Sequence, residues 1–253
     1  MERKFEETPH QKDAEEHPLG HLVEEYDDES TPLKVRKINL LETVGLPISE
    51  TDILSKDNKQ EIKEKIIERL HGGDVSLVVR FSGRDDGLGM PSCYIDNEED
   101  LGDILEQMED IFTHDPNISH VILQSATPRR EASNKVSGRL MMYDDVDSGY
   151  DEIVELYKGA RSTGVLNLVD PSDPQFHRLV KPLGGFMKPR EEIDPSSTLT
   201  TGEVVGIVRK LNDKRDAIEI VQSVLRQSRR HSRNDYTLEF SYRDGDLIFT
   251  DID

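Results

Sequence analysis

The last segment of the chain predicts a β-hairpin, and this hairpin constrains the fold more than any other feature. We expect its strands over residues 236–242 and 246–252, joined by the turn Arg243-Asp244-Gly245-Asp246. Asp-Gly is a strong short-range signal for a tight hairpin turn. Because pairing around the turn sets which residues face one another, it brings Glu239 of the first strand near Asp251 of the second.

Carboxylates gather in this hairpin. Asp251 and Asp253 are two residues apart and so lie on one face of their strand, close to Glu239. Three converging carboxylates repel one another unless a cation joins them, and magnesium binds a few carboxylate oxygens together with waters and substrate phosphates. The pattern favours a magnesium site formed by Glu239, Asp251 and Asp253. A solvent-facing acidic strand is the alternative, because clusters of like charge are usually solvated surface.

The acidic composition disfavours some classes of partner. The 253 residues include 52 acidic and 32 basic side chains, which gives a formal net charge of -20. Nucleic acids and anionic membrane surfaces are disfavoured as partners, because both attract an excess of Lys and Arg. The single cysteine, Cys93, allows no intrachain disulfide, and no stretch approaches the roughly 18 consecutive apolar residues of a membrane span. We therefore expect a cytoplasmic protein that binds neither nucleic acid nor membrane.

The order of the predicted elements indicates an α+β fold. Residues 1–33 are rich in Glu, Asp, His and Pro, and we expect a solvated, disordered acidic tail there. Beyond the tail, the spacing of apolar residues predicts helices over 34–44, 58–71, 101–111, 151–160 and 201–230, and strands over 76–81, 121–124, 138–143 and 164–169. Strands and helices mix without strict βαβ alternation. We expect two lobes, residues 34–120 and 121–253.

One buried strand delivers an arginine toward a glycine-rich loop. Ser76–Phe81 is mostly apolar apart from Arg80, and the glycines of residues 83–92 include Gly87 and Gly89. Glycine lets backbone N–H groups approach phosphate oxygens closely, and arginine donates to phosphate in a bidentate manner. The segment lacks both the Gly-Lys-Ser/Thr of a P-loop and a G-x-G-x-x-G fingerprint. It is a candidate phosphate site, with an ordinary surface loop as the alternative.

Five short motifs stand in a fixed order between residues 34 and 253. They are Arg36-Lys37-Ile38-Asn39-Leu40 with the following Gly45-Leu46-Pro47-Ile48, then Val78-Val79-Arg80-Phe81-Ser82, Val121-Ile122-Leu123-Gln124, Ser137-Gly138-Arg139-Leu140-Met141, and Leu238-Glu239-Phe240 with Asp244-Gly245-Asp246-Leu247-Ile248. In this order they resemble the nucleotide-binding domain of phosphoenolpyruvate synthase and pyruvate phosphate dikinase, within the ATP-grasp superfamily.

The resemblance implies an ATP-grasp-like fold of two lobes with a nucleotide between them, and it implies roles for single residues. Lys37 and Arg80 would contact the ATP phosphates and are the candidate catalytic residues. The residues implied in holding the nucleotide are Lys37, Arg80, Ser82, Gly87, Gly89 and Gln124, with Gln124 near the adenine. Those implied in holding magnesium are Glu239, Asp251 and Asp253.

Departures from the family pattern leave the reaction open. The related enzymes end their hairpin with Gln-x-Arg, where this chain has Asp251-Ile252-Asp253, and their phosphohistidine and pyruvate-binding domains have no counterpart in this sequence. We expect an ATP-dependent phosphotransferase, or the nucleotide-binding subunit of one, that acts on a small molecule or on a separate phosphoacceptor protein. An ATP-dependent carboxylate–amine ligase is the alternative that the Asp251-x-Asp253 ending favours. A non-catalytic interaction module of degenerate ATP-grasp fold is the third possibility.

Overall fold

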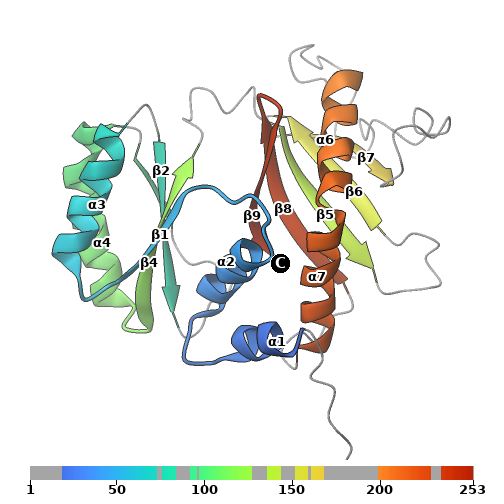
Figure 1. Cartoon of the computed structure of the whole chain (residues 1–253). Coiled ribbons are helices and arrows are strands. Elements are labelled where there is room, and N and C mark those ends of the chain that lie inside the picture. The colour runs from blue at the N-terminus through green and yellow to red at the C-terminus, as the bar shows by residue number, and fades with distance from the viewer. Residues whose placement is uncertain are drawn as a thin grey trace, which may run out of the picture.

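Two antiparallel sheets, each covered by helices on one face, make up the part of the chain that the structure describes (Figure 1). The structure is a computed structural model, and it describes residues 19–72, 76–83, 92–95, 97–126, 136–143, 152–158, 161–167, 199–228 and 235–252. Separate helices and antiparallel sheets confirm the predicted α+β class.

The first sheet has the strand order β1-β4-β2-β3, and all of its neighbouring strands are antiparallel. Its strands are β1 (Thr51–Ser55), β2 (Ser76–Gly83), β3 (Ser92–Ile95) and β4 (Ile118–Ala126). One face is covered by α3 (Lys59–His71) and α4 (Leu101–His114), and the short 3-10 turn η1 (Glu98–Asp100) leads directly into α4. Alternate residues of β2, Leu77, Val79 and Phe81, pack into the core that these helices share with the sheet.

The second sheet has the strand order β7-β6-β5-β8-β9. Its strands are β5 (Val136–Tyr143), β6 (Glu152–Lys158), β7 (Arg161–Asn167), β8 (Asp235–Arg243) and β9 (Asp246–Ile252). Helices α6 (Thr201–Asp213) and α7 (Arg215–Gln227) pack on one face, over Leu140, Leu238 and Ile252. The predicted hairpin is confirmed, and its turn residues Asp244 and Gly245 both have positive φ, as a tight hairpin turn requires.

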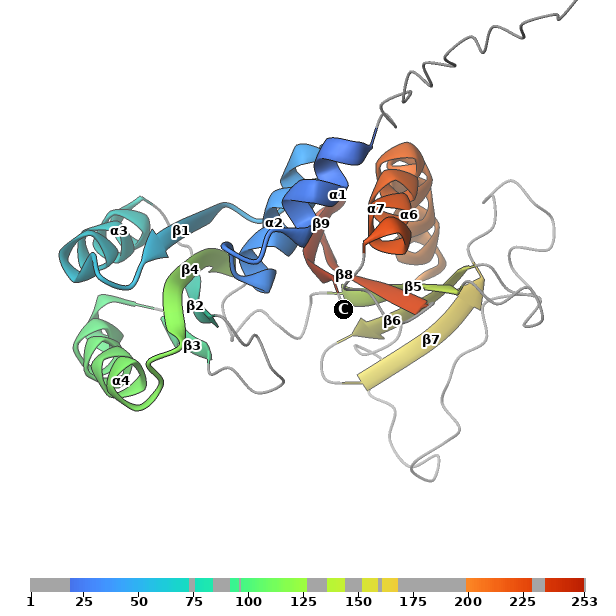
Figure 2. The same cartoon turned by 90° about the horizontal axis from the view of Figure 1, so that it is seen from below.

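Helix α2 (Leu33–Thr43) links the two sheets, and Figure 2 shows it between them next to α1 (Gly20–Asp27). Val35 of α2 packs on Ile122 of the first sheet, whereas Leu41 belongs to the core under the second sheet. The segment after α2 then pairs with the last strand, where the Phe249 amide donates to the Pro47 carbonyl at 2.7 Å. Helix α2 and the segment after it therefore meet the last strand, β9, between the two sheets.

The prediction of a disordered acidic tail was wrong from residue 20 onward, because residues 20–27 form helix α1. Leu22 and Tyr26 of α1 are buried in the core of the second sheet. Two apolar side chains one turn apart are enough to dock a short helix on an existing core, although the composition around them is polar. Residues 1–18 lie outside the described part of the chain.

Two further predictions of helices were wrong. Residues 152–158 form strand β6, because Val154 and Leu156 are buried at alternate positions, which is the period of a strand. The single helix expected over 201–230 is divided at Lys214 into α6 and α7. Strand β4 runs across residue 120, where we expected one lobe to end. In the part of the chain that the structure describes, every helix is too short or too polar to cross a membrane.

Candidate functional site

Arg80 of the first sheet and Asp251 of the second sheet meet between the two sheets. Arg80 Nη1 lies 3.4 Å from Asp251 Oδ2, and Lys34 Nζ of α2 lies 3.6 Å from the same oxygen. The Asp251 side chain is 14% exposed and each of the two cations is 26% exposed, so water screens these pairs only in part. Three elements that are distant in sequence thus bring their charges to one point.

The strand periodicity explains why Arg80 points here. Its neighbours Val79 and Phe81 face helices α3 and α4, so Arg80 faces away from those helices. On the second sheet, Leu238 and Ile252 face α6 and α7, which turns Glu239 and Asp251 to the opposite face of that sheet. Each sheet therefore keeps an apolar face for its helices and a face with charged groups that points away from them.

Glu239 lies directly opposite Asp251 in the pairing of β8 with β9. On its other side it faces Arg139 of β5, whose Nη2 and Nε lie 2.8 and 2.9 Å from Glu239 Oε1. Glu155 of β6 is the next residue in the same row. We call Lys34, Arg80, Arg139, Glu239 and Asp251 the charge cluster. It runs from α2 and the first sheet across the face of the second sheet that points away from α6 and α7.

Gln124 and Ser82 lie on the same face of the first sheet as Arg80. In the strand pairing, Gln124 is opposite Val78, and Ser82 follows Arg80 by two residues on β2. Gln124 is buried and donates to Thr51 Oγ1 at 3.4 Å, and Ser82 is fully buried. The predicted roles of both residues at a nucleotide stay predictions; the structure shows only that both share the face of Arg80.

Lys34 is a site residue that the sequence reasoning missed. We predicted that Lys37 of α2 would contact the phosphates. Lys37 is partly exposed and lies three positions after Lys34 in this helix. The cation that the structure places against Asp251 is Lys34. Lys34 lies one helical turn from Lys37, and its place against Asp251 depends on the rotation of α2 about its axis, which sequence alone does not give.

Three predicted site residues, Gly87, Gly89 and Asp253, lie outside the residues that the structure describes. Within the described residues, no group of three or more His, Cys, Asp or Glu side chains is placed to hold a metal ion. Glu239 and Asp251 alone are a suitable pair for magnesium, which usually takes one or two carboxylates and completes its shell with waters and substrate phosphates. The donor chemistry therefore fits magnesium when a phosphate substrate supplies further oxygens.

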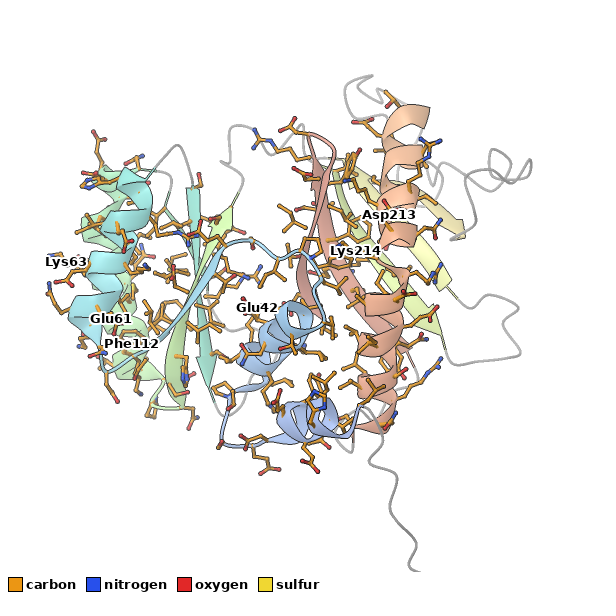
Figure 3. The ribbon with its side chains drawn as sticks, viewed as in Figure 1. Glu42, Glu61, Lys63, Phe112, Asp213 and Lys214 are labelled. Carbon is orange, nitrogen blue, oxygen red and sulfur yellow. The ribbon has the colours of Figure 1, made fainter. Side chains whose placement is uncertain are left out.

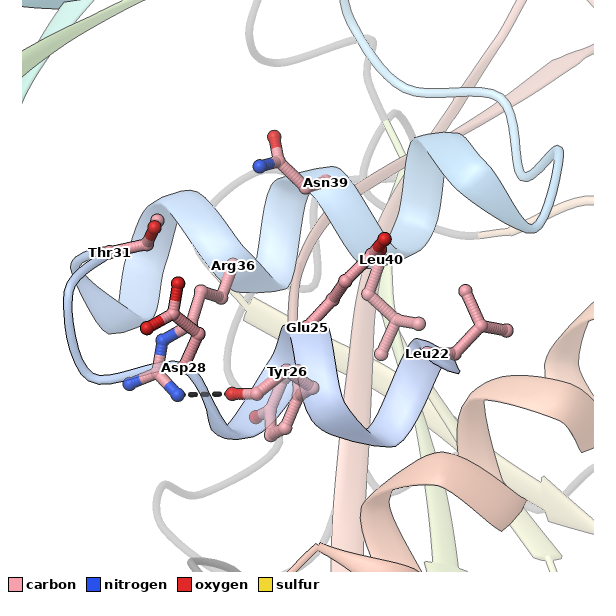
Figure 4. Close-up of a pocket in the computed structure, with 8 residues that line it drawn as sticks. All are labelled: Leu22, Glu25, Tyr26, Asp28, Thr31, Arg36, Asn39 and Leu40. Atoms are coloured by element: carbon pink, nitrogen blue, oxygen red, sulfur yellow. Dashed lines mark hydrogen bonds between the residues drawn. The ribbon is translucent and has the colours of Figure 1, made fainter. Parts of the chain in front are cut away.

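A hollow of about 160 Å³ lies between α1 and α2, and none of its lining residues belongs to the charge cluster (Figure 4). Arg36 in its wall is buried, donates to the Tyr26 carbonyl and has its guanidinium carbon 5.8 Å from the centre of the Tyr26 ring. Burial also raises the pKa of Tyr26 to about 12. These contacts fasten α1 to α2.

Comparison with protein-family models and with curated proteins found no match to this chain. Among solved structures, it is similar to the biotin carboxylase domain of 2-oxoglutarate carboxylase from Hydrogenobacter thermophilus, a structure in complex with MgADP, ADP and bicarbonate. The TM-score is 0.49 with 13% identity, over 92% of this chain and 41% of that one. It is similar to D-alanyl-alanine synthetase A from Vibrio cholerae, with a TM-score of 0.47 and 11% identity, over 87% of this chain and 54% of that one.

A third similar structure is a RimK domain ATP-grasp protein from Sphaerobacter thermophilus. The TM-score is 0.39 with 12% identity, over 85% of this chain and 55% of that one. The chain thus spans about half the length of the solved structures it matches. All these TM-scores lie below 0.5, so the function has to follow from the residues of this chain.

Proposed function

We propose that this chain binds ATP and magnesium between its two sheets, in the manner of an ATP-grasp protein, with the charge cluster at the triphosphate. The observation that carries the proposal is the meeting of Arg80, Lys34 and Asp251 between the sheets. Two cations and a carboxylate from three separate elements have no common role in the core of either sheet, whereas together they suit a phosphate chain with its metal ion.

Arg80 and Lys34 would contact the phosphates. In a protein with a net charge of -20, a polyanion needs locally gathered cations, and here Arg80 comes from the first sheet and Lys34 from helix α2. Arginine presents a planar fork that matches phosphate oxygens, while lysine acts as a compact point charge. During phosphoryl transfer such cations offset the charge on the moving group, and positioning does most of the rest.

Glu239 and Asp251 would hold the magnesium ion, and Asp253 would join them. When bound, the ion would neutralise phosphate charge and polarise the phosphoryl group. Arg139 pairs with the Glu239 carboxylate from the neighbouring strand β5, which would fix its position on the sheet. Gln124, on the same face of the first sheet as Arg80, would lie near the adenine, as the sequence resemblance implies.

Within this proposal, the reaction we infer is an ATP-dependent phosphoryl transfer, either complete in the full protein or as the nucleotide-binding part of a phosphotransferase. The acceptor would be a small molecule or a separate phosphoacceptor protein. The strand Val78–Ser82 with Arg80 supports the dikinase type of this chemistry. None of the three solved structures named above is described as a phosphoenolpyruvate synthase or a dikinase.

A carboxylate–amine ligase is the second candidate, and the position of Asp251 favours it. The wider ATP-grasp superfamily closes its site with an acidic residue followed by Glu-x-Asn, which Asp251-Ile252-Asp253 resembles in sequence, and Asp251 lies directly opposite Glu239. The products separate the two chemistries. Release of ADP with formation of an acyl-phosphate-dependent product indicates the ligase, whereas release of AMP indicates the dikinase.

Calorimetry with ATP and magnesium tests the binding proposal on the wild-type chain, on Glu239→Ala with Asp251→Ala, and on Lys34→Gln. We expect binding by the wild type, and affinity lower by at least about tenfold when a charge-assisted contact is removed. Lys63→Gln is the matched control, because Lys63 lies on the outward side of α3, away from the second sheet (Figure 3). No binding by the wild type, or an equal loss in the Lys63 control, contradicts the proposal.

A further inference from the structure

The Asp251 carboxylate forms ion pairs with Arg80 and Lys34, the two cations that would contact the phosphates in the proposed function. Its Oδ2 lies 3.4 Å from Arg80 Nη1 and 3.6 Å from Lys34 Nζ. A phosphate oxygen that approaches either cation must therefore compete with a carboxylate that is part of the same chain. We propose that Asp251 makes this site specific for the metal-bound nucleotide and excludes the metal-free form; the inference rests on the proposed function.

Two electrostatic effects act against a metal-free triphosphate. Its phosphates compete with Asp251 for Arg80 and Lys34, and they also approach the negative charges of Asp251 and Glu239. A divalent cation removes both obstacles, because it offers the carboxylates a new partner and leaves Arg80 and Lys34 to the phosphates. Binding of the metal complex is then an exchange of partners in which every charge stays paired.

Asp251 suits this role better than its neighbour Glu239. The Asp251 side chain is 14% exposed, against 30% for Glu239, so its ion pairs are less screened by water. Glu239 pairs with Arg139 inside its own sheet, whereas Asp251 pairs with groups from the first sheet and from α2. Only the second arrangement occupies cations on which the nucleotide depends in the proposed function.

The second oxygen of Asp251 allows a clean substitution. Asp251 Oδ1 accepts a hydrogen bond from the Ile252 amide at 2.9 Å, while Oδ2 faces the cations. Asparagine keeps an oxygen for the amide and removes the negative charge, with nearly the same volume. Asp246→Asn is the matched control, since Asp246 lies at the exposed start of the same strand. Asp251→Ser provides a second neutral variant.

The test measures ATP affinity by calorimetry, once with a chelator and no divalent cation and once with excess magnesium. We expect the wild type to bind ATP well only with magnesium. Asp251→Asn should bind metal-free ATP more tightly than the wild type by roughly tenfold, the change expected when one partly buried competing charge is removed. The same variant should bind the magnesium complex more weakly, so the two affinities change in opposite directions.

The control Asp246→Asn should leave both affinities as in the wild type. If both neutral variants at position 251 bind metal-free ATP no more tightly than the wild type, the inference is overturned. The binding of magnesium-ATP by the wild type, and with it the proposed function, would then still hold. If the wild type binds ATP in neither condition, the proposed function and this inference fall together.

Discussion

Arg69 shows how this molecule uses a cation for structure alone. Its side chain is 8% exposed, and its guanidinium lies 2.7 Å from Glu50 Oε1 and 3.1 Å from Asp52 Oδ2, while it donates to Ser125 Oγ at 2.5 Å. These contacts fasten α3 to strands β1 and β4. Without the guanidinium, Asp52 and Ser125 lose a partly buried partner, whereas Glu50 is 74% exposed and is solvated by water. We therefore expect Arg69→Ala to lower the free energy of unfolding by about 1–3 kcal/mol in urea denaturation.

Lys59→Ala on the same helix is the control for this prediction. Lys59 is 57% exposed and pairs with Glu109, which is equally exposed. Exposed ion pairs contribute little, so the free energy of unfolding should fall by less than about 1 kcal/mol. Equal losses in the two variants would contradict the structural role that we assign to Arg69.

The sequence predicted only those members of the charge cluster whose positions follow from local strand patterns. Arg80 interrupts an apolar strand, and Glu239 and Asp251 follow from the register of a hairpin with an Asp-Gly turn. Lys34 and Arg139 were not predicted as site residues, because their positions depend on how α2 and β5 pack against distant strands. Contacts between elements far apart in sequence have no local signature.

At the scale of elements, Gly138 sets how closely β5 approaches its neighbours. A Cβ atom at this position would overlap the ring of Phe240 and lie 3.0 Å from Leu156 Cδ2, inside the core under the second sheet. Overfilling of a packed core forces side chains out of their preferred rotamers. We expect Gly138→Ala to lower the free energy of unfolding by about 1–3 kcal/mol, measured by urea denaturation.

Gly102 is the opposite case, and it makes a sharp control. It lies in α4, and a Cβ atom added there would have no other group within 4 Å among the described residues, so the methyl group meets open space. Alanine also loses less backbone entropy than glycine when a helix forms, and Gly102→Ala should raise the free energy of unfolding by about 0.5–1 kcal/mol. The same sign of change in both variants would contradict the packing described for Gly138.

The elements that the sequence did not reveal share a physical cause. Strands β1 and β3 are short edge strands of the first sheet, with little room for an alternating pattern. Helix α1 is held by Leu22 and Tyr26 on a core that other elements build. By contrast, the hairpin β8–β9, strand β2 and helix α3 carry their own turn or periodic signals, and their predictions are confirmed.

At the scale of the whole molecule, the two sheets are joined by helix α2, by the pairing of Pro47 with Phe249 and by the ion pairs of Asp251. In the proposed function, a nucleotide binds where these connections meet. Such a ligand contacts β2 from one side and β9 from the other. It must therefore stabilise two segments that are far apart in the described sequence, since a ligand bound only to the native state stabilises that state.

Hydrogen exchange of the full chain with and without magnesium-ATP tests this claim most directly. We predict that magnesium-ATP slows amide exchange in both residues 76–83 of β2 and residues 246–252 of β9. For amides that exchange only when the bound region opens, the exchange rate should fall by up to roughly a hundredfold at a ligand concentration of about 100 times the Kd. Helix α3, which packs on the face of the first sheet that points away from the site, serves as the internal reference. Binding accompanied by protection of only one of the two strands, or of neither, would contradict a site between the sheets.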